Sequence, residues 1–160
     1  MDQERMRLAI QLAEMAAQDG EVPVGAIITL PDGTVVGQGR NRREKQKNAL
    51  CHAELEAINE ACRKLGGWRL WQCTMYVTLE PCPMCAGAIV NARIARVVYG
   101  AKDLKNGACG SALDVFSMPN GFRPETVSGV LEDECTALMQ SFFQRLRTQP
   151  PKVQTWKKNR

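Results

Sequence analysis

Residues 76–89 read YVTLEPCPMCAGAI, and within this stretch the sequence changes from one kind of local structure to another. Apolar and polar residues alternate over residues 73–79, which predicts a strand. The chain then enters an apolar segment in which Pro83 suits the first turn of a helix. The stretch therefore predicts a strand that leads directly into a helix, and we expect this helix to end near Asn91.

The segments around this stretch predict a mixed α/β fold. Further elements are predicted over residues 4–18 (helix), 22–30 and 34–39 (strands of a hairpin), 96–100 (strand) and 112–116 (a short helix within the loop 101–121). The basic residues 40–47 are predicted to form a loop. This order of helices and strands implies a mixed sheet with helices on both faces.

Two further helices are predicted to have one apolar face each. The first is capped by Asn48 and runs to about Lys64. Its inward residues are expected to be Leu55, Ile58, Cys62 and Leu65. The second runs from Glu132 to about Arg147, with acidic residues in its first turn and arginines in its last, which suits the helix dipole. Its inward residues are expected to be Cys135, Leu138, Met139, Phe142, Phe143 and Leu146.

The composition fits a single domain without a membrane span. The chain has 160 residues, of which 44% are hydrophobic, and this is enough for one buried core. A run of about 18 uncharged apolar residues is absent, which excludes a membrane-spanning helix. The first residues are charged and lack the apolar region of a secretory signal, so a cytoplasmic location is expected.

The net charge of +4 is concentrated at the end of the chain. Residues 145–160 hold six basic residues and no acidic one, which leaves the preceding part with 15 basic and 17 acidic residues. We therefore expect a nearly neutral domain over residues 1–148 and a basic tail over residues 149–160. A second basic cluster lies in the loop 40–47. Such clusters often contact phosphates, although a solvated terminus and an exposed loop would give the same pattern.

The seven cysteines do not suggest a disulfide framework, because their number is odd and no secretory signal is present. Cys62 and Cys135 lie on the predicted apolar faces of helices and are expected to pack as small hydrophobic residues. Only Cys82 and Cys85 form a closely spaced pair.

The one histidine of the chain, His52, combines with Cys82 and Cys85 into a set of three zinc-binding residue types. A catalytic zinc ion needs three protein ligands and an open position for water. The two cysteines fall at the start of one predicted helix, where they share a face and where thiolates are favoured. Glu54 is then expected to carry protons for a zinc-bound water, whose pKa zinc lowers to about 7.

Each half of this pattern has another interpretation when taken alone. A Cys-x-x-Cys pair is as typical of a redox site as of a metal site, and a single histidine is usually a satisfied polar group. Together the halves favour zinc, because they match the His-x-Glu and Pro-Cys-x-x-Cys signature of zinc deaminases. A Ser-His-Asp or Cys-His hydrolase would require His52 to leave the metal, and no glycine-rich phosphate loop is present.

Beyond these residues, the sequence resembles the cytidine and nucleoside deaminase superfamily and, within it, the bacterial tRNA-specific adenosine deaminases. The likeness runs from Met6 to about Arg147, and residues 76–89 are its strongest block. Other matching blocks are residues 20–26 (GEVPVGA), 41–43 (NRR), 68–70 (WRL), 96–103 (RVVYGAKD) and 129–131 (GVL). The resemblance implies a cytidine-deaminase-like α/β/α three-layer sandwich with a five-stranded mixed sheet.

The resemblance also implies an activity and the residues that carry it. The activity is the hydrolytic conversion of adenosine to inosine, a cleavage of a cyclic amidine C–N bond, at the wobble position (34) of a tRNA anticodon. One zinc ion per subunit would be held by His52, Cys82 and Cys85, with Glu54 moving protons in the deaminase domain, residues 1–148.

The same resemblance implies how the substrate is bound. Asn41 would hydrogen-bond the flipped-out nucleoside, and the backbone around Ala53 would read the base. A homodimer is implied, with the tRNA anticodon loop bound across both subunits. The loop 40–47 and the basic tail would contact phosphates.

Two departures from the family and two alternative functions complete the expectations. Residues 49–51 read Ala-Leu-Cys where the family has Pro-Thr-Ala, and residues 121–123 read Gly-Phe-Arg where it has Asn-His-Arg. One alternative is a deaminase of a free nucleobase or nucleoside of guanine, adenine or cytosine type, which would share the metal residues. The other is a non-catalytic zinc-binding RNA module, which the presence of Glu54 disfavours.

Overall fold

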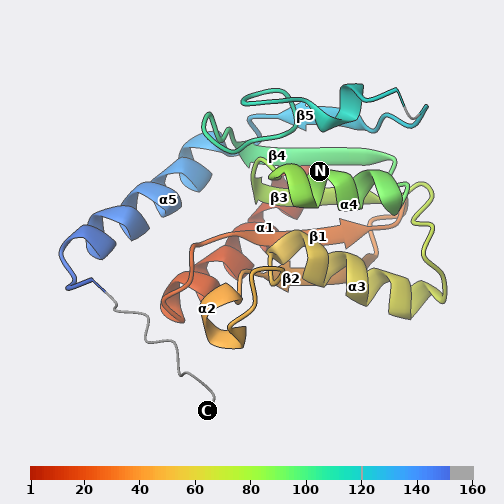
Figure 1. Ribbon diagram of the computed structural model, residues 1–160. Coiled ribbons are helices and arrows are strands. Elements are labelled where there is room, and N and C mark those ends of the chain that lie inside the picture. The colour runs from red at the N-terminus through yellow and green to blue at the C-terminus, as the bar shows by residue number, and fades with distance from the viewer. Residues whose placement is uncertain (120, 152–160) are drawn as a thin grey trace, which may run out of the picture.

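The computed structural model describes residues 1–119 and 121–151. Within these residues, five strands form one sheet in the order β2-β1-β3-β4-β5 (Figure 1). The strands are β1 (Gly25–Thr29), β2 (Val35–Arg40), β3 (Thr74–Leu79), β4 (Arg96–Ala101) and β5 (Glu125–Ser128). β1 pairs antiparallel with β2 and β3, whereas β3, β4 and β5 run parallel. The predicted five-stranded mixed sheet is confirmed.

Helices cover both faces of the sheet. They are α1 (Asp2–Gln18), α2 (Arg43–Gln46), α3 (Ala53–Leu65), α4 (Pro83–Asn91) and α5 (Glu132–Arg147), with a 3-10 helix at Val115–Ser117. Figure 1 shows α3 and α4 in front of the sheet and α1 behind it. Successive strand residues point to opposite faces, so Ile28 packs into the α3 and α4 side of the core and Ile27 into the α1 and α5 side. The predicted three-layer sandwich is therefore confirmed.

The expectation for the start and inner face of α3 is wrong. The helix begins at Ala53 with His52 as its N-cap, and the side chain of Asn48 instead accepts a hydrogen bond from the backbone N–H of Leu50 (2.9 Å) in a turn. The residues packed on the sheet are Ala53, Ala57 and Ala61. Small residues replace large ones there because Gly37 and Gly39 of β2 bring the two backbones close together.

The larger apolar residues predicted to face inward from α3 lie at the margins of its contact with the sheet. Leu55, Ile58 and Cys62 are partly buried, and Leu65 is exposed. The sequence pattern therefore predicted the wrong inner face for this helix, because leucine and isoleucine contribute more to a hydrophobic pattern than alanine does.

The expectation for α5 is correct for only part of the helix. Cys135 and Phe142 are buried, as predicted, but Phe143 and Leu146 are exposed. Figure 1 shows that α5 runs past the ends of the strands, and the two exposed side chains belong to its last two turns. All seven cysteines are free thiols.

The segment 40–47 is not entirely a loop, because α2 occupies its centre. A helix this short has unpaired backbone N–H groups at its start, and the buried carboxylate of Glu21 accepts hydrogen bonds from those of Glu44 (2.9 Å) and Lys45 (3.2 Å).

Within residues 1–119 and 121–151, the structure has no helix that combines the length and the apolar character of a membrane span.

An ion pair fastens the start of α1 to the sheet. Asp2 accepts two hydrogen bonds from the guanidinium of Arg96 on β4 (2.9 and 2.8 Å) and a third from the hydroxyl of Tyr76 on β3 (3.0 Å). The hydrogen bond from Arg96 lowers the pKa of Asp2, and the bond from Tyr76 acts in the same direction. Asp2 thus links the outer helix to two central strands.

We predict that Asp2→Asn lowers the free energy of unfolding at pH 7 by about 1–2 kcal/mol, since partly exposed charge-assisted hydrogen bonds are lost. Because the folded-state pKa of Asp2 is lowered, its contribution is complete above the unfolded value of about 4 and disappears as the pH falls through the folded value. In urea unfolding, the difference in the free energy of unfolding between variant and parent should therefore be constant from pH 7 to 5 and become smaller below pH 4. Equal midpoints at pH 7 would contradict the assignment, and Glu14→Gln at an exposed position on α1 is the control.

Candidate active site

The sequence-predicted metal residues lie where two helices begin. His52 is the N-cap of α3 and Cys82 is the N-cap of α4, and both have extended backbone conformations. Neither side chain caps its own helix, so both are available for other contacts. Pro83 begins α4 with the backbone angle that a helix needs, and Cys85 follows one turn into the helix.

The structure brings the three metal-binding residue types together. The Nδ1 atom of His52 lies 3.6 Å from the sulfur of Cys82 and 3.5 Å from that of Cys85. One ligand atom from each residue can be chosen so that all three lie within 4.8 Å of one another. One imidazole nitrogen and two sulfurs are the donor set that zinc prefers over magnesium or calcium. The group therefore fits a zinc ion.

The two thiols of this group differ in character. The hydrogen bond from the Cys85 thiol, supported by that from His52, lowers the pKa of Cys82 to about 4. The same contact with Cys82 raises the pKa of Cys85, and burial adds to the effect. The hydrogen bond with Cys82 also raises the pKa of His52. Cys82 is thus a thiolate at neutral pH, as expected for a sulfur at a helix N-terminus.

Glu54 lies in the first turn of α3, next to the metal-binding group. Only 4% of its surface is exposed, and burial raises the pKa of its carboxyl. A carboxyl group whose pKa is raised toward neutrality can both accept and donate a proton during a reaction.

A cavity of about 320 Å³ opens over these residues. Its lining includes five of the residues singled out from the sequence, namely Asn41, His52, Ala53, Glu54 and Cys82, while Cys85 is buried. Asn41 is itself buried, and its side-chain oxygen accepts a hydrogen bond from the backbone N–H of Arg43 (3.0 Å). The structure therefore places five of the six predicted site residues in the lining of one cavity and the sixth, Cys85, against His52.

Other lining residues were not foreseen from the sequence. Arg43, Glu80, Asp103 and Asn106 also line the cavity, and no local pattern assigned them to it. Arg43, Glu80 and Asp103 lie within the blocks that resemble the family, and Arg43 also belongs to the basic cluster 40–47. The residues come from the start of α2, the end of β3 and the loop after β4, which local sequence patterns do not bring together.

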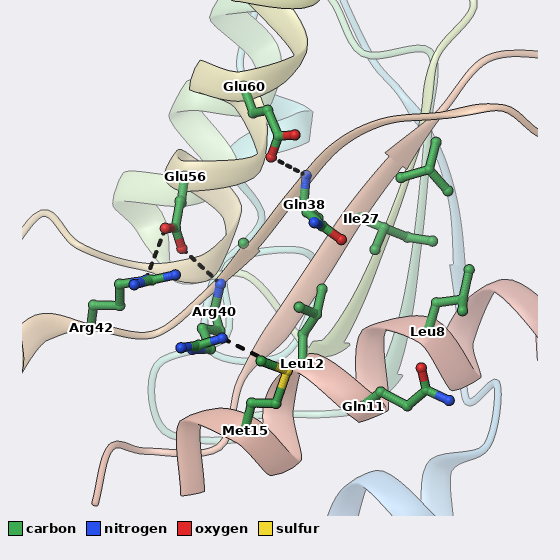
Figure 2. A pocket seen from close by; sticks show the side chains of 12 residues that line it. Leu8, Gln11, Leu12, Met15, Ile27, Gln38, Arg40, Arg42, Glu56 and Glu60 are labelled. Carbon is green, nitrogen blue, oxygen red and sulfur yellow. Dashed lines mark hydrogen bonds and ion pairs between the residues drawn. The ribbon is translucent and has the colours of Figure 1, made fainter. Parts of the chain in front are cut away.

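A second cavity, of about 460 Å³, lies along the outer edge of β2 between α1 and α3 (Figure 2). Glu56 accepts a hydrogen bond from the backbone N–H of Arg40 (2.9 Å), and Glu60 accepts one from that of Gln38 (3.2 Å). Figure 2 shows both glutamates reaching from α3 to the strand. The two glutamates therefore accept hydrogen bonds from backbone N–H groups of β2 that an edge strand would otherwise offer to another chain.

The ion pairs beside this second cavity change the expectation for the basic cluster at residues 40–47. Arg40 pairs with Asp19 (3.3 Å) and Arg42 pairs with Glu56 (2.9 Å), so these two charges are balanced within the protein. Arg43, Lys45 and Lys47 are the exposed members of the cluster. Any phosphate contact from this segment would therefore depend on these three.

Cys51, the departure next to His52, lines a different cavity of about 450 Å³ together with Leu50 and Leu55. Its thiol is partly buried and free. The substitution of cysteine for alanine at this position therefore changes a neighbouring surface, not the lining of the cavity above Glu54.

The fold and the gathered residues are those of a deaminase, and comparison with known proteins supports this. The family model of MafB19-like deaminases matches residues 1–147. The tRNA-specific adenosine deaminase of Bacillus subtilis is 44% identical over 147 residues, which cover 91% of each chain. The chain therefore belongs to the MafB19-like deaminase family, in the group of the tRNA-specific adenosine deaminases.

Solved structures give the same picture. One, from a study of A-to-I editing by tRNA:A34 deaminases at the wobble position of transfer RNA, is 43% identical, covers 84% of this chain and 98% of that one, and superimposes with a TM-score of 0.81. A guanine deaminase from Bacillus subtilis is 31% identical, covers 94% and 96%, and gives a TM-score of 0.61. The chain is thus closer in both sequence and shape to the A34 deaminase structure than to this guanine deaminase.

Proposed function

We propose that this protein is a zinc-dependent deaminase that converts adenosine to inosine at position 34 of a tRNA anticodon. The observation that carries the proposal is the gathering of His52, Cys82 and Cys85 beside the buried carboxyl of Glu54 in one cavity. The identity to tRNA-specific adenosine deaminases supports the substrate. A tRNA substrate would place the protein in the cytoplasm.

Three residues would hold the zinc ion, namely His52, Cys82 and Cys85. The ion would supply a Lewis acid that makes water a nucleophile near neutral pH. The Cys82 thiolate brings a negative charge to the ion, and the start of α4 stabilises that charge. His52 is fixed by its position as the N-cap of α3, where its backbone is extended and its ring faces the two sulfurs.

Glu54 would carry protons between water and the base. Its burial keeps bulk water from competing for the carboxyl, and its place in the first turn of α3 puts it beside His52. It would take a proton from the attacking water and donate it to the ring nitrogen as the C–O bond forms. It would then take the proton of the newly added hydroxyl group and pass it to the amine, which leaves as ammonia when the C–N bond breaks. The cavity excludes the rest of the RNA, so only a base turned out of its stack would reach the carboxyl.

Asn41 and Ala53 would place the nucleoside. The oxygen of the Asn41 side chain is engaged by the backbone of Arg43, so its amide N–H groups would face the cavity as donors to the substrate. Ala53 has no side chain beyond its Cβ and is among the residues that line the cavity, so a base could approach the backbone at the start of α3. Both residues would orient the substrate without taking part in bond breaking.

An RNA substrate is favoured over a free base because a cationic groove continues from the cavity. The groove, about 750 Å³, is lined by Lys102, Lys105 and Arg147 together with the exposed ring of Phe143. Asp103 and Asn106 line both it and the cavity over Glu54. Positive side chains beside an exposed aromatic ring suit a single-stranded nucleic acid, whose phosphates and bases they can contact in turn.

The domain arrangement and the oligomeric state are further parts of the proposal. Residues 1–148 would form the deaminase domain and residues 149–160 a basic tail, whose Lys152, Lys157, Lys158 and Arg160 lie outside the described residues. A homodimer is supported by Leu50, which is 59% exposed and lines a cavity with Cys51 and Leu55. Apolar side chains gathered at an open surface are typical of protein contacts.

The first prediction from this proposed function concerns the substrate. The purified protein should release ammonia and form inosine from an anticodon stem-loop with adenosine at position 34, and should leave free adenosine, guanine and cytosine unchanged, because the groove adds affinity only for a polynucleotide. The same stem-loop with guanosine at position 34 is the control. Turnover of a free base with none of the stem-loop would favour the nucleobase deaminase instead.

The second prediction separates the roles of the site residues. Glu54→Gln should keep one zinc per subunit and normal stem-loop binding but lose about 10²–10⁴-fold in turnover, because the proton carrier is gone. His52→Ala should lose zinc as well as activity. Metal content by atomic emission, measured beside activity, checks both. A Glu54→Gln protein without zinc, or a His52→Ala protein with normal zinc, would show that the roles are wrongly assigned.

The third prediction concerns the groove. The double variant Lys102→Glu and Lys105→Glu should bind the stem-loop more weakly, and the slope of log affinity against log salt should fall by about 0.7 for each lost phosphate contact. Arg63→Glu, at an exposed position near the end of α3, is the control and should leave both quantities unchanged. An unaltered salt slope in the double variant would mean that the RNA follows another path.

A further inference from the structure

Glu80 is a buried carboxylate that the reaction described above does not use. It follows β3 and precedes Pro81-Cys82, and only 2% of its surface is exposed. Burying a charge is costly unless hydrogen bonds replace the lost water. Its surroundings therefore have to provide those bonds.

One loop supplies four hydrogen bonds to this carboxylate. Oε1 accepts from the backbone N–H of Asp103 (3.3 Å) and from the hydroxyl of Ser111 (2.5 Å). Oε2 accepts from the backbone N–H groups of Cys109 (3.1 Å) and Ser111 (3.2 Å). An ionised carboxylate has about four acceptor sites, so the loop 103–111 takes up the acceptor capacity of Glu80.

The loop that Glu80 holds is one wall of the active-site cavity. Asp103 and Asn106 line the cavity with Glu54, and they also line the cationic groove. The Asp103 carboxylate accepts hydrogen bonds from the backbone N–H groups of Lys105 (3.1 Å) and Asn106 (3.0 Å), so these residues are fixed relative to one another. The position of this wall therefore depends on where the loop is anchored.

The fit between loop and carboxylate is close. A Cβ atom on Gly107 would collide with the carboxyl group of Glu80 and with the carbonyl oxygen of Asp103, so the loop can wrap around Glu80 only with glycine there. A second tie, from the N–H of Ala108 to the carbonyl of Pro81 (2.8 Å), lies beside it. The loop thus curls around the side chain instead of merely touching it.

We propose that Glu80 is a positioning residue: by anchoring the loop 103–111, it sets where Asp103 and Asn106 meet the RNA. It acts on the placement of the substrate and not on the making or breaking of bonds, which belongs to Glu54. This inference rests on the proposed function for its substrate. The anchoring of the loop itself is independent of the substrate.

Glu80→Gln tests the inference with almost no change in size. The glutamine offers one acceptor oxygen, and its NH₂ group faces backbone N–H groups that also donate, so about half of the loop's hydrogen bonds are lost. We expect KM for the stem-loop to rise about tenfold, with kcat within about twofold of the parent. Amide hydrogen exchange should become faster within residues 103–111 but not in β1, β3 or β4. Zinc content should be unchanged.

Ser111→Ala is a second variant that removes one hydrogen bond to Oε1 and leaves Glu80 charged, and it serves if Glu80→Gln does not fold. KM for the stem-loop should rise by a few-fold. In the double variant of Glu80→Gln and Ser111→Ala, the rise in KM should be smaller than the product of the two single rises, because both substitutions act on one contact. Glu14→Gln, at an exposed position on α1, is the matched control and should change neither KM nor exchange.

Three results would overturn the inference: an unchanged KM with unchanged exchange, a fall in kcat at constant KM, or faster exchange throughout the sheet, which would mark a general structural role. If the parent protein did not act on the stem-loop, the proposed function would fail, but the exchange of residues 103–111 would still decide whether Glu80 anchors the loop.

Discussion

The close approach of α3 to β2 is the constraint on which the site depends. A Cβ atom on Gly37 or Gly39 would collide with the carbonyl oxygen of Ala57 or Ala53 on the helix, so any larger residue would push α3 away from the sheet. Because His52 is the N-cap of this helix, such a shift would move its ring away from the two sulfurs of α4. The position of the metal-binding group is therefore set by how closely α3 packs on β2.

Three glutamates, Glu21, Glu54 and Glu80, are buried but differ in their partners. Glu21 accepts hydrogen bonds from the start of α2, and Glu80 accepts four from the loop 103–111. Their charges are stabilised by these donors, which makes them structural anchors. Glu54 instead lies beside the metal-binding group, and burial raises the pKa of its carboxyl. Its neighbours are the groups that would take part in the reaction, and this separates its chemical role from the anchoring role of the other two.

The sequence predicted the parts of this molecule that depend on local pattern. The strand before Pro81, the bounds of α4 and the zinc-binding residue types all follow from spacing over a few positions. It failed where packing decides. Asn48 is a good helix cap by type but closes a turn, and the leucines of α3 outweigh in the pattern the alanines that contact the sheet. Glu80 was missed because its partners lie more than twenty positions away in a loop without regular structure.

Substrate choice has to arise outside the metal-binding group, because the same fold also serves a guanine deaminase. A free base would fill a cavity of about 320 Å³ and make no use of charges beyond it. The body of the protein is nearly neutral, yet Lys102, Lys105 and Arg147 gather in the groove that continues from this cavity. A nucleotide within a chain has phosphates on both sides of the reacting base, and only such a substrate would gain from this arrangement. The distribution of charge, more than the chemistry of the cavity, is therefore what favours RNA.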